Sequence, residues 1–177
     1  MQISDREFWT VVHGMGMGAI FLLAFGGGLA GLYSLRPEWL TTSGLAERLA
    51  RLKAGLWTMA VVAWGTVLTG TYIVYPWYRA APPQGATDLS AFPRYLLLAS
   101  KGTELWHEFG MEWKEHVGWI APIAATVVAY VVSRYGAQLA AESKLRRALI
   151  WFYAAAFVTA LAAGGFGAFI HKVAPVR

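Results

Sequence analysis

The sequence predicts an all-α integral membrane protein, an up-down bundle of four hydrophobic helices, and three observations support this fold class. Hydrophobic residues make up 57% and charged residues only 14% of the 177-residue chain, whereas soluble domains carry roughly 25% charged residues. Four apolar stretches are long enough to cross a bilayer as helices, which takes ~20 residues. The nine tryptophans also fit a membrane, because indole rings collect at its interfaces. We therefore expect a single membrane domain over residues 1–177.

The first two spans are expected at about residues 8–33 and 54–75. The first contains no charged residue and is too long for the h-region of a signal peptide, which has about 7–15 residues. The second stops at Pro76, since proline interrupts helical hydrogen bonding. The connection between the two spans is expected to hold a short interfacial helix, Ser43–Leu52.

The third span, at about residues 113–133, is expected to belong to a longer helix that extends beyond the outer face. That helix should begin near Glu104 with Thr103 as its N-cap. The outer loop before it, residues 76–103, contains Pro82-Pro83, which exclude a regular helix there.

The fourth span is expected at about residues 148–171, and the basic residues orient the whole bundle. Short cytoplasmic loops carry an excess of Lys and Arg. The two short connections hold eight of these residues: Arg36, Arg48, Arg51, Lys53, Arg134, Lys144, Arg146 and Arg147. This distribution predicts a multi-pass protein of the inner (plasma) membrane with its N- and C-termini on the extracytoplasmic side.

The composition also limits the chemistry. The chain has no cysteine, which excludes disulfides, iron–sulfur clusters and covalent c-type haem. The net charge of +5 suits anionic lipid and not nucleic acid, because no basic patch is interleaved with aromatic residues. No nucleophile–base pair or zincin motif indicates hydrolysis.

All four histidines fall toward the outer side of the expected bundle: His13, His107, His116 and His171. Ionisable groups at membrane depth are costly and usually functional. His13 and His171 each lie roughly 35 Å above the inner basic boundary, at ~1.5 Å per helical residue. They come from the first and fourth helices, which are neighbours in an up-down bundle.

Histidines that project into a helical bundle can hold the iron of non-covalent haem b as axial ligands. Gly14 and Gly167 lie beside candidate ligands and would leave room for a flat macrocycle. His107 and His116 are on one helix and point to different faces, so they would not bind the same iron. A thioether could replace one imidazole, with four candidates: Met15, Met17, Met59 and Met111. The alternative interpretation is that the histidines bond to carbonyls or headgroups and the glycines pack helices together.

Acidic residues surround two of the histidines in residues 104–116. Glu104 and His107 have the spacing of a di-iron motif, but the chain has no second such motif. Glu112 and His116 are four residues apart on one helix face, so the carboxylate could orient the imidazole. A carboxylate here could also take a proton from a quinol. The alternative is a solvated first helical turn, where acids favour the positive end of the helix dipole.

In size, span layout and outer-side histidines, the chain resembles the small four-helix membrane b-type cytochromes that anchor respiratory or photosynthetic complexes. His13, His116 and His171 carry the resemblance. It implies haem b as cofactor, a possible quinone, and electron transfer between the quinone pool and an extracytoplasmic redox partner. The chain would then be a subunit of an oxidoreductase complex in a hetero- or homo-oligomer, with other membrane or periplasmic redox subunits as partners. It lacks histidine pairs at two membrane depths, which favours transfer near the outer face.

Two other functions remain open from the sequence. One is a cofactor-free accessory or assembly subunit that packs against a larger membrane complex through its glycine-rich faces. The other is a metal-binding membrane protein that uses the Glu104–His116 segment.

Overall fold

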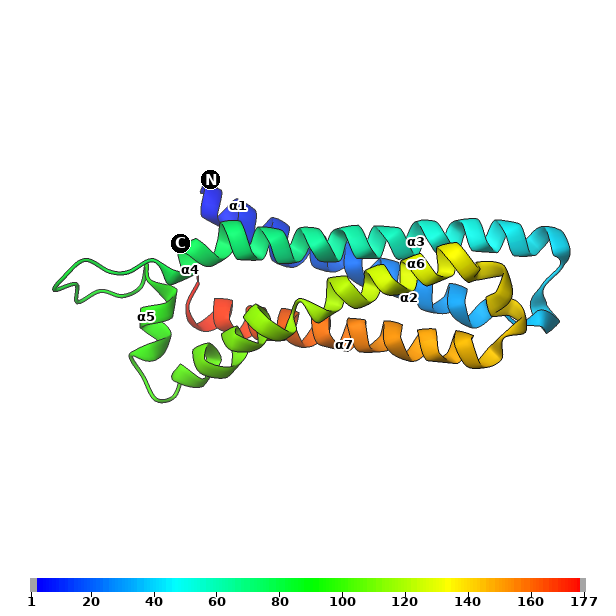
Figure 1. Ribbon diagram of the computed structural model, residues 1–177. Helices are drawn as coiled ribbons and strands as arrows, with labels where there is room; N and C mark the ends of the chain where they lie inside the picture. Colours follow the sequence, from blue (N-terminus) through cyan, green and yellow to red (C-terminus); the bar gives the residue numbers. More distant parts are fainter. Residues whose placement is uncertain (1–2, 176–177) are drawn as a thin grey trace. The chain divides into compact units, whose positions relative to one another are not determined.

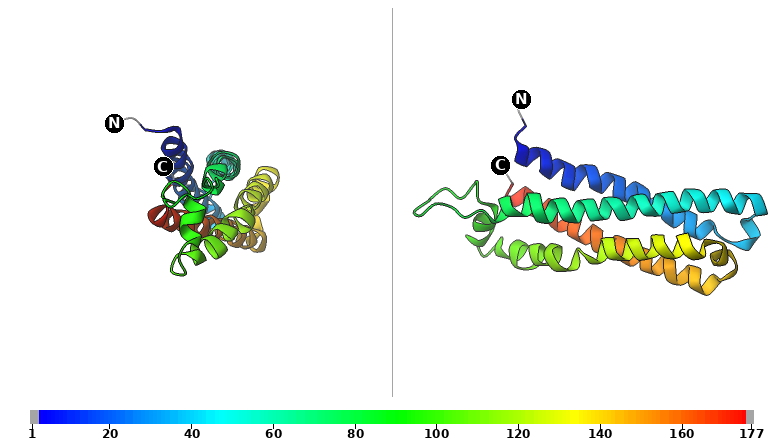
Figure 2. Two further views of the ribbon diagram at one scale, coloured as in Figure 1. Left: turned by 90° about the vertical axis from the view of Figure 1, so that its left-hand side faces the viewer. Right: turned by 45° about the horizontal axis from the view of Figure 1, so that its top comes forward.

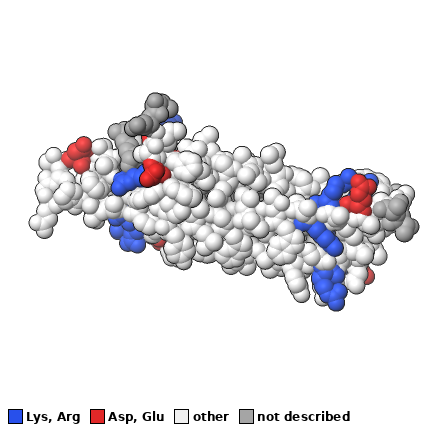
Figure 3. Space-filling view, turned by 90° about the horizontal axis from the view of Figure 1, so that it is seen from above, with Lys and Arg blue, Asp and Glu red and all other residues white. Residues whose placement is uncertain are grey.

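The computed structural model describes residues 3–175, and these are 83% helical with no strand. Figure 1 shows the helices in chain order. Four are long and apolar enough to cross a membrane: Asp5–Ser34, Gly44–Arg79, Trp106–Ala141 and Ser143–Val173. The chain is therefore a multi-pass helical membrane protein, and the surface seen in Figure 3 is mostly uncharged. The prediction of four membrane-spanning helices is confirmed.

Each of these helices is longer at both ends than the span predicted from the sequence. The apolar run marks the part that must satisfy its backbone without water. Polar residues with good helix propensity then continue the hydrogen-bonded ladder into the headgroup region. The interfacial segment Ser43–Leu52 is indeed helical, but it is the first part of α3 (Thr42–Thr69) and not a separate helix.

The chain forms two compact units, which are described separately. Unit 1 comprises Met1–Gly18, Gly65–Trp119 and Ala160–Arg177, and unit 2 comprises Ala19–Trp64 and Ile120–Thr159. The long outer connection lies in unit 1, and the two short connections lie in unit 2.

Unit 2 contains most of α2 (Met17–Ser34) and α3, all of α6 (Ile120–Ala141) and the first part of α7 (Ser143–Val173). The buried side of α6 consists mainly of small residues at helical spacing: Ala121, Ala124, Ala125, Val128, Ala129 and Val132. Small side chains let helix backbones approach closely, which is the main source of helix association in lipid.

Two contacts fix the helices of unit 2. The Tyr153 hydroxyl donates to the Ala24 carbonyl at 3.2 Å, and a Cβ on Gly28 would collide with that hydroxyl. Glycine at this position therefore allows α2 and α7 to meet. At the short connections, Arg146 Nη1 donates to the carbonyls of Leu35 at 2.6 Å and Leu139 at 2.8 Å.

Unit 1 begins with α1 (Asp5–Val11), which Ser4 and Glu7 close with reciprocal capping hydrogen bonds. Figure 2 gives two further views of this end of the chain. The unit also contains four segments with the wider π-helical hydrogen-bond pattern: Val12–Gly16, Gly70–Val74, Trp106–Met111 and Trp113–Val117. Such turns occur mostly as single insertions inside α-helices and frequently at functional sites.

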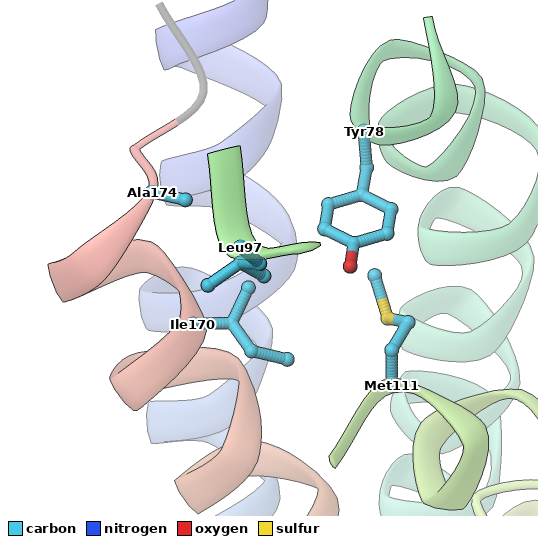
Figure 4. Packing of buried hydrophobic residues seen from close by; sticks show 5 residues of the cluster. All are labelled: Tyr78, Leu97, Met111, Ile170 and Ala174. Carbon is cyan, nitrogen blue, oxygen red and sulfur yellow. The ribbon is translucent and has the colours of Figure 1, made fainter. Parts of the chain in front are cut away.

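The outer connection after α4 (Tyr75–Arg79) is irregular through Pro82-Pro83, as predicted, and turns at Gly85 with φ +79°. It then forms α5 (Pro93–Leu98), which was not predicted. Leu97 of this helix is fully buried. It belongs to the apolar cluster in Figure 4, whose members are Tyr78, Leu97, Met111, Ile170 and Ala174.

The third membrane helix is helical from Glu104, as predicted. The predicted N-cap is wrong, because the Thr103 hydroxyl donates to the Leu97 carbonyl at 2.7 Å and caps no amide. The hydroxyl instead fastens the start of this helix to α5.

Candidate functional site

All four histidines belong to unit 1. Three of them, His13, His107 and His116, lie in π-helical segments, and His171 lies in the last turn of α7. An inserted residue changes the direction of the side chains that follow it along a helix. The π-helical turns therefore help to set where these imidazoles point.

His13 is half-buried and packs against Gly70, where an added Cβ would lie 2.7 Å from the imidazole Cε1. Its Nδ1 is 3.3 Å from the Thr69 hydroxyl oxygen. The Thr69 hydroxyl also donates to the Gly65 carbonyl at 2.7 Å, and the Thr66 backbone interacts with the imidazole as well. Residues of one turn of the second membrane helix thus position the His13 ring.

His107 is oriented by a buried tyrosine. Its Nδ1 is 2.8 Å from the Tyr78 hydroxyl, and the two ring centroids are 5.9 Å apart. Only 2% of Tyr78 is exposed. The phenol packs in the apolar cluster of Figure 4 while its polar end reaches the imidazole.

His116 and His171 are more exposed. His116 Nδ1 donates to the Glu112 carbonyl at 3.0 Å and lies 3.4 Å from the Glu112 carboxylate, so the two side chains share a face as predicted. His171 lines a groove of about 280 Å³ together with residues of the first helix: Ile3, Glu7, Thr10 and Val11. Within unit 1, the ends of the first and fourth membrane helices are thus neighbours.

The second membrane helix carries no histidine. The structure shows that it supplies the partners of two histidines, Thr69 for His13 and Tyr78 for His107. The signal in the sequence was the presence of polar hydroxyl groups in and just after an apolar span, where each must find a partner.

Gly14 and Gly167 differ in their surroundings. A Cβ on Gly14 would meet no heavy atom within 4 Å, whereas a Cβ on Gly167 would lie 2.6 Å from Lys114 Nζ. The space beside Gly167 is therefore occupied by an ammonium group. The charge of Lys114 also acts on His13, so these residues from three helices belong to one local environment.

Glu115 extends the polar part of unit 1 toward α4. Its carboxylate interacts with the Tyr75 hydroxyl, and the guanidinium of Arg79 lies over the Tyr75 ring, 5.4 Å from its centroid. The Glu115 Oε1 atom is buried and has no hydrogen-bond partner, and the same is true of Arg94 Nε and Trp113 Nε1. Unpartnered buried polar atoms are uncommon in native structures and call for a functional or solvent partner.

These residues provide imidazole nitrogens and a protonatable carboxylate in one unit. Among residues 3–175, no group of three or more His, Asp or Glu side chains is arranged to hold a metal ion. A haem needs only one or two axial nitrogens from the protein, since the porphyrin supplies the other four.

The fold and these residues define a class, the multi-pass helical membrane proteins with ionisable side chains in their apolar helices. No family model, curated protein or solved structure matches the chain. The function is therefore argued from the residues of the site.

Proposed function

We propose that the protein is a haem b-binding membrane subunit that transfers electrons between the quinone pool and an extracytoplasmic redox partner. The proposal rests on the way in which the His13 imidazole is held by its neighbours. Its Nδ1 lies 3.3 Å from the Thr69 hydroxyl and its ring packs against Gly70, so the imidazole is held in place, and we propose Nε2 as the nitrogen that binds iron. Metal-binding histidines typically donate their other ring N–H to such a partner.

His171 is the proposed second axial ligand, with His116 and His107 as the remaining candidates. His171 lines the groove that includes Thr10, three residues before His13 and on the same face of the first helix. Gly14, Gly164 and Gly165 have no heavy atom within 4 Å of an added Cβ. This open surface suits a flat ring, and the ammonium of Lys114 suits a propionate.

The bound haem would supply one-electron chemistry, and the residues around it would handle protons. A quinol that gives up two electrons also releases two protons. The free Oε1 of Glu115 is a buried acceptor, and Tyr75 connects this carboxylate to Arg79 near the outer connection. We propose Glu115 as the first proton acceptor of a quinol bound in unit 1.

The topology that goes with this function is an up-down left-handed bundle in the inner membrane. Both termini and the outer connection would lie on the extracytoplasmic side, with the helix that begins at Glu104 extending beyond the membrane. This orientation rests on the basic residues of the two short connections.

The test is a visible spectrum of the purified protein, with pyridine haemochrome extraction to identify the haem. A Soret band and a b-type haemochrome are expected, and His13→Ala and His171→Ala should each remove most of the haem. The matched control is Gln138→Ala, an exposed polar side chain of unit 2. Protein that carries no Soret band and yields no haemochrome would refute the proposal.

A cofactor-free assembly subunit is the second candidate, and the open glycine face of the first helix favours it. A Cβ on Gly14 would meet no heavy atom within 4 Å. If this candidate is correct, Gly14→Leu abolishes association with the partner complex, while His13→Ala, His116→Ala and His171→Ala change nothing. Co-purification of the complex distinguishes the two functions.

A further inference from the structure

An open groove of about 560 Å³ lies within unit 2, along α2 and the start of α3. Its lining is small or apolar along most of α2 and basic at one end. The residues that matter are Gly27, Gly31, Ser34, Arg48, Arg51 and Gly55. Among the residues that the structure describes, no carboxylate lines it.

The groove runs over glycines of α2, which have no side chain to fill it. Gly27 is exposed and an added Cβ would meet nothing within 4 Å. Gly31 is closed beneath by Leu52, whose Cδ1 lies 2.8 Å from where a Cβ would be. The groove is therefore a surface channel, and its open side faces away from the helices that form it.

The basic end has two guanidinium groups, and each makes only a weak interaction within the chain. Arg48 Nη1 reaches the Ser34 carbonyl only at 3.5 Å. Arg51 pairs with Glu47 at 2.8 Å, but the two side chains are 69% and 68% exposed, and such surface pairs contribute ~0–1 kcal/mol. Both groups can therefore turn toward a stronger anion without leaving a buried partner behind.

The dimensions of the groove match one leaflet of a bilayer. The lining on α2 runs from Leu23 to Ser34, which is roughly 16 Å of helix at ~1.5 Å per residue. This is about half of the ~30 Å hydrocarbon thickness. The basic end lies beside the short connection, where headgroups are expected.

We propose that this groove binds one anionic phospholipid of the leaflet on the side of the short connections. An acyl chain lies along the glycine floor, and the phosphate accepts hydrogen bonds from Arg48 and Arg51. The length of the channel, its apolar floor and the two weakly held guanidinium groups at its basic end all fit this ligand. The inference does not depend on the proposed redox function.

The test is native mass spectrometry of the detergent-solubilised full chain, titrated with phosphatidylglycerol or phosphatidylcholine. We expect one phosphatidylglycerol to bind in preference to phosphatidylcholine. In Arg48→Gln/Arg51→Gln, affinity should fall roughly 30-fold, because each basic residue near an anionic headgroup contributes ~1 kcal/mol, about a factor of five.

The groove itself is tested with a neighbouring pair of glycines. Gly27→Leu fills the channel and should abolish the bound lipid, whereas Gly26→Leu should not, because Gly26 is equally open but does not line the groove. Arg134→Gln/Arg147→Gln removes the same charge elsewhere in unit 2 and should leave binding unchanged.

Three results would overturn the inference. They are equal binding of the two lipids, equal effects of Gly26→Leu and Gly27→Leu, and displacement of the lipid by millimolar inorganic phosphate, which would indicate a simple anion site. A change of oligomeric state in Gly27→Leu without lipid loss would assign the groove to a second copy of the chain and also exclude the proposal.

Discussion

Thr69 shows how one hydroxyl can decide the chemistry of a neighbouring imidazole. The Thr69 hydroxyl lies 3.3 Å from His13 Nδ1 and also donates to the Gly65 carbonyl of its own helix. A side chain of the same shape without that oxygen would remove one of the contacts that orient the His13 ring. The hydroxyl therefore acts mainly on the orientation of the imidazole.

Thr69→Val tests this role. If His13 binds iron, loss of the orienting oxygen should weaken haem binding ~10–100-fold, the usual cost of removing such a partner. The measurement is haem retained per protein during dilution. Thr159→Val is the control, because the Thr159 hydroxyl bonds only to the Ala155 carbonyl of its own helix. Equal retention in the two variants would contradict the assignment.

A second prediction for single residues concerns the contact between Gly28 and Tyr153, where α2 meets α7. Gly28→Ala places a methyl group against the Tyr153 hydroxyl and should destabilise the fold by about 1–3 kcal/mol, as overpacking does. Tyr153→Phe loses only one hydrogen bond, worth ~0.6 kcal/mol between membrane helices. Unfolding in a denaturing detergent titration measures both. Gly26→Ala, with open space around it, should match the wild type, and a loss there would count against this account.

At the scale of elements, α5 turns the outer connection into an ordered cap on unit 1. Leu97 is fully buried while the next residue, Leu98, is 39% exposed. Leu97 thus anchors this short helix together with the buried Pro93, and Thr103 ties the following turn back to it. Of the two, Leu97 belongs to the apolar cluster of unit 1.

Leu97→Ala should make the connection between the second and third membrane helices less ordered. Truncation of a buried leucine costs about 2–5 kcal/mol, more than a six-residue helix can gain elsewhere. Limited trypsin digestion should then cut at Arg94 and Lys101 faster than in the wild type. Leu98→Ala should leave the cleavage rate unchanged, and equal rates in both variants would show that α5 is held by other contacts.

The sequence predicted the helices well and their internal geometry poorly. Apolar runs around Phe21 or Val128 are long enough to identify spans from hydropathy alone. The π-helical turns at His13 and His107 could not be predicted, because they depend on how Thr69, Gly70 and Tyr78 meet these rings in three dimensions. The partial burial of Lys114 against Gly167 was also missed, since its neighbours Glu112, Glu115 and His116 resemble a solvated helical turn.

At the scale of the whole molecule, the division of the connections between two units agrees with four membrane crossings. Residues 80–103 belong to unit 1, and the connections after Ser34 and Ala141 belong to unit 2. The four histidines and Glu115 fall in unit 1, and the lipid groove falls in unit 2.

The absence of cysteine from the sequence makes topology straightforward to measure. Single substitutions Ser100→Cys and Ser143→Cys introduce thiols at exposed positions. In intact cells, an impermeant maleimide should label only Ser100→Cys, because basic short loops stay in the cytoplasm. The control is labelling of both after lysis. Labelling of Ser143→Cys alone would reverse the orientation, and labelling of both in intact cells would contradict four crossings.

The contact between Arg146 and Leu35 can form only late in the synthesis of the chain. The guanidinium joins the carbonyl of Leu35, at the end of the first hairpin's leading helix, to those of Leu139 and Ala140. The ribosome makes Leu35 more than a hundred residues before this arginine. The first two membrane helices therefore lack these hydrogen bonds until the last two have been synthesised. Any truncation upstream of Arg146 would leave a nascent chain whose Leu35 carbonyl has lost this partner, and quality-control proteases could recognise such an unfinished chain.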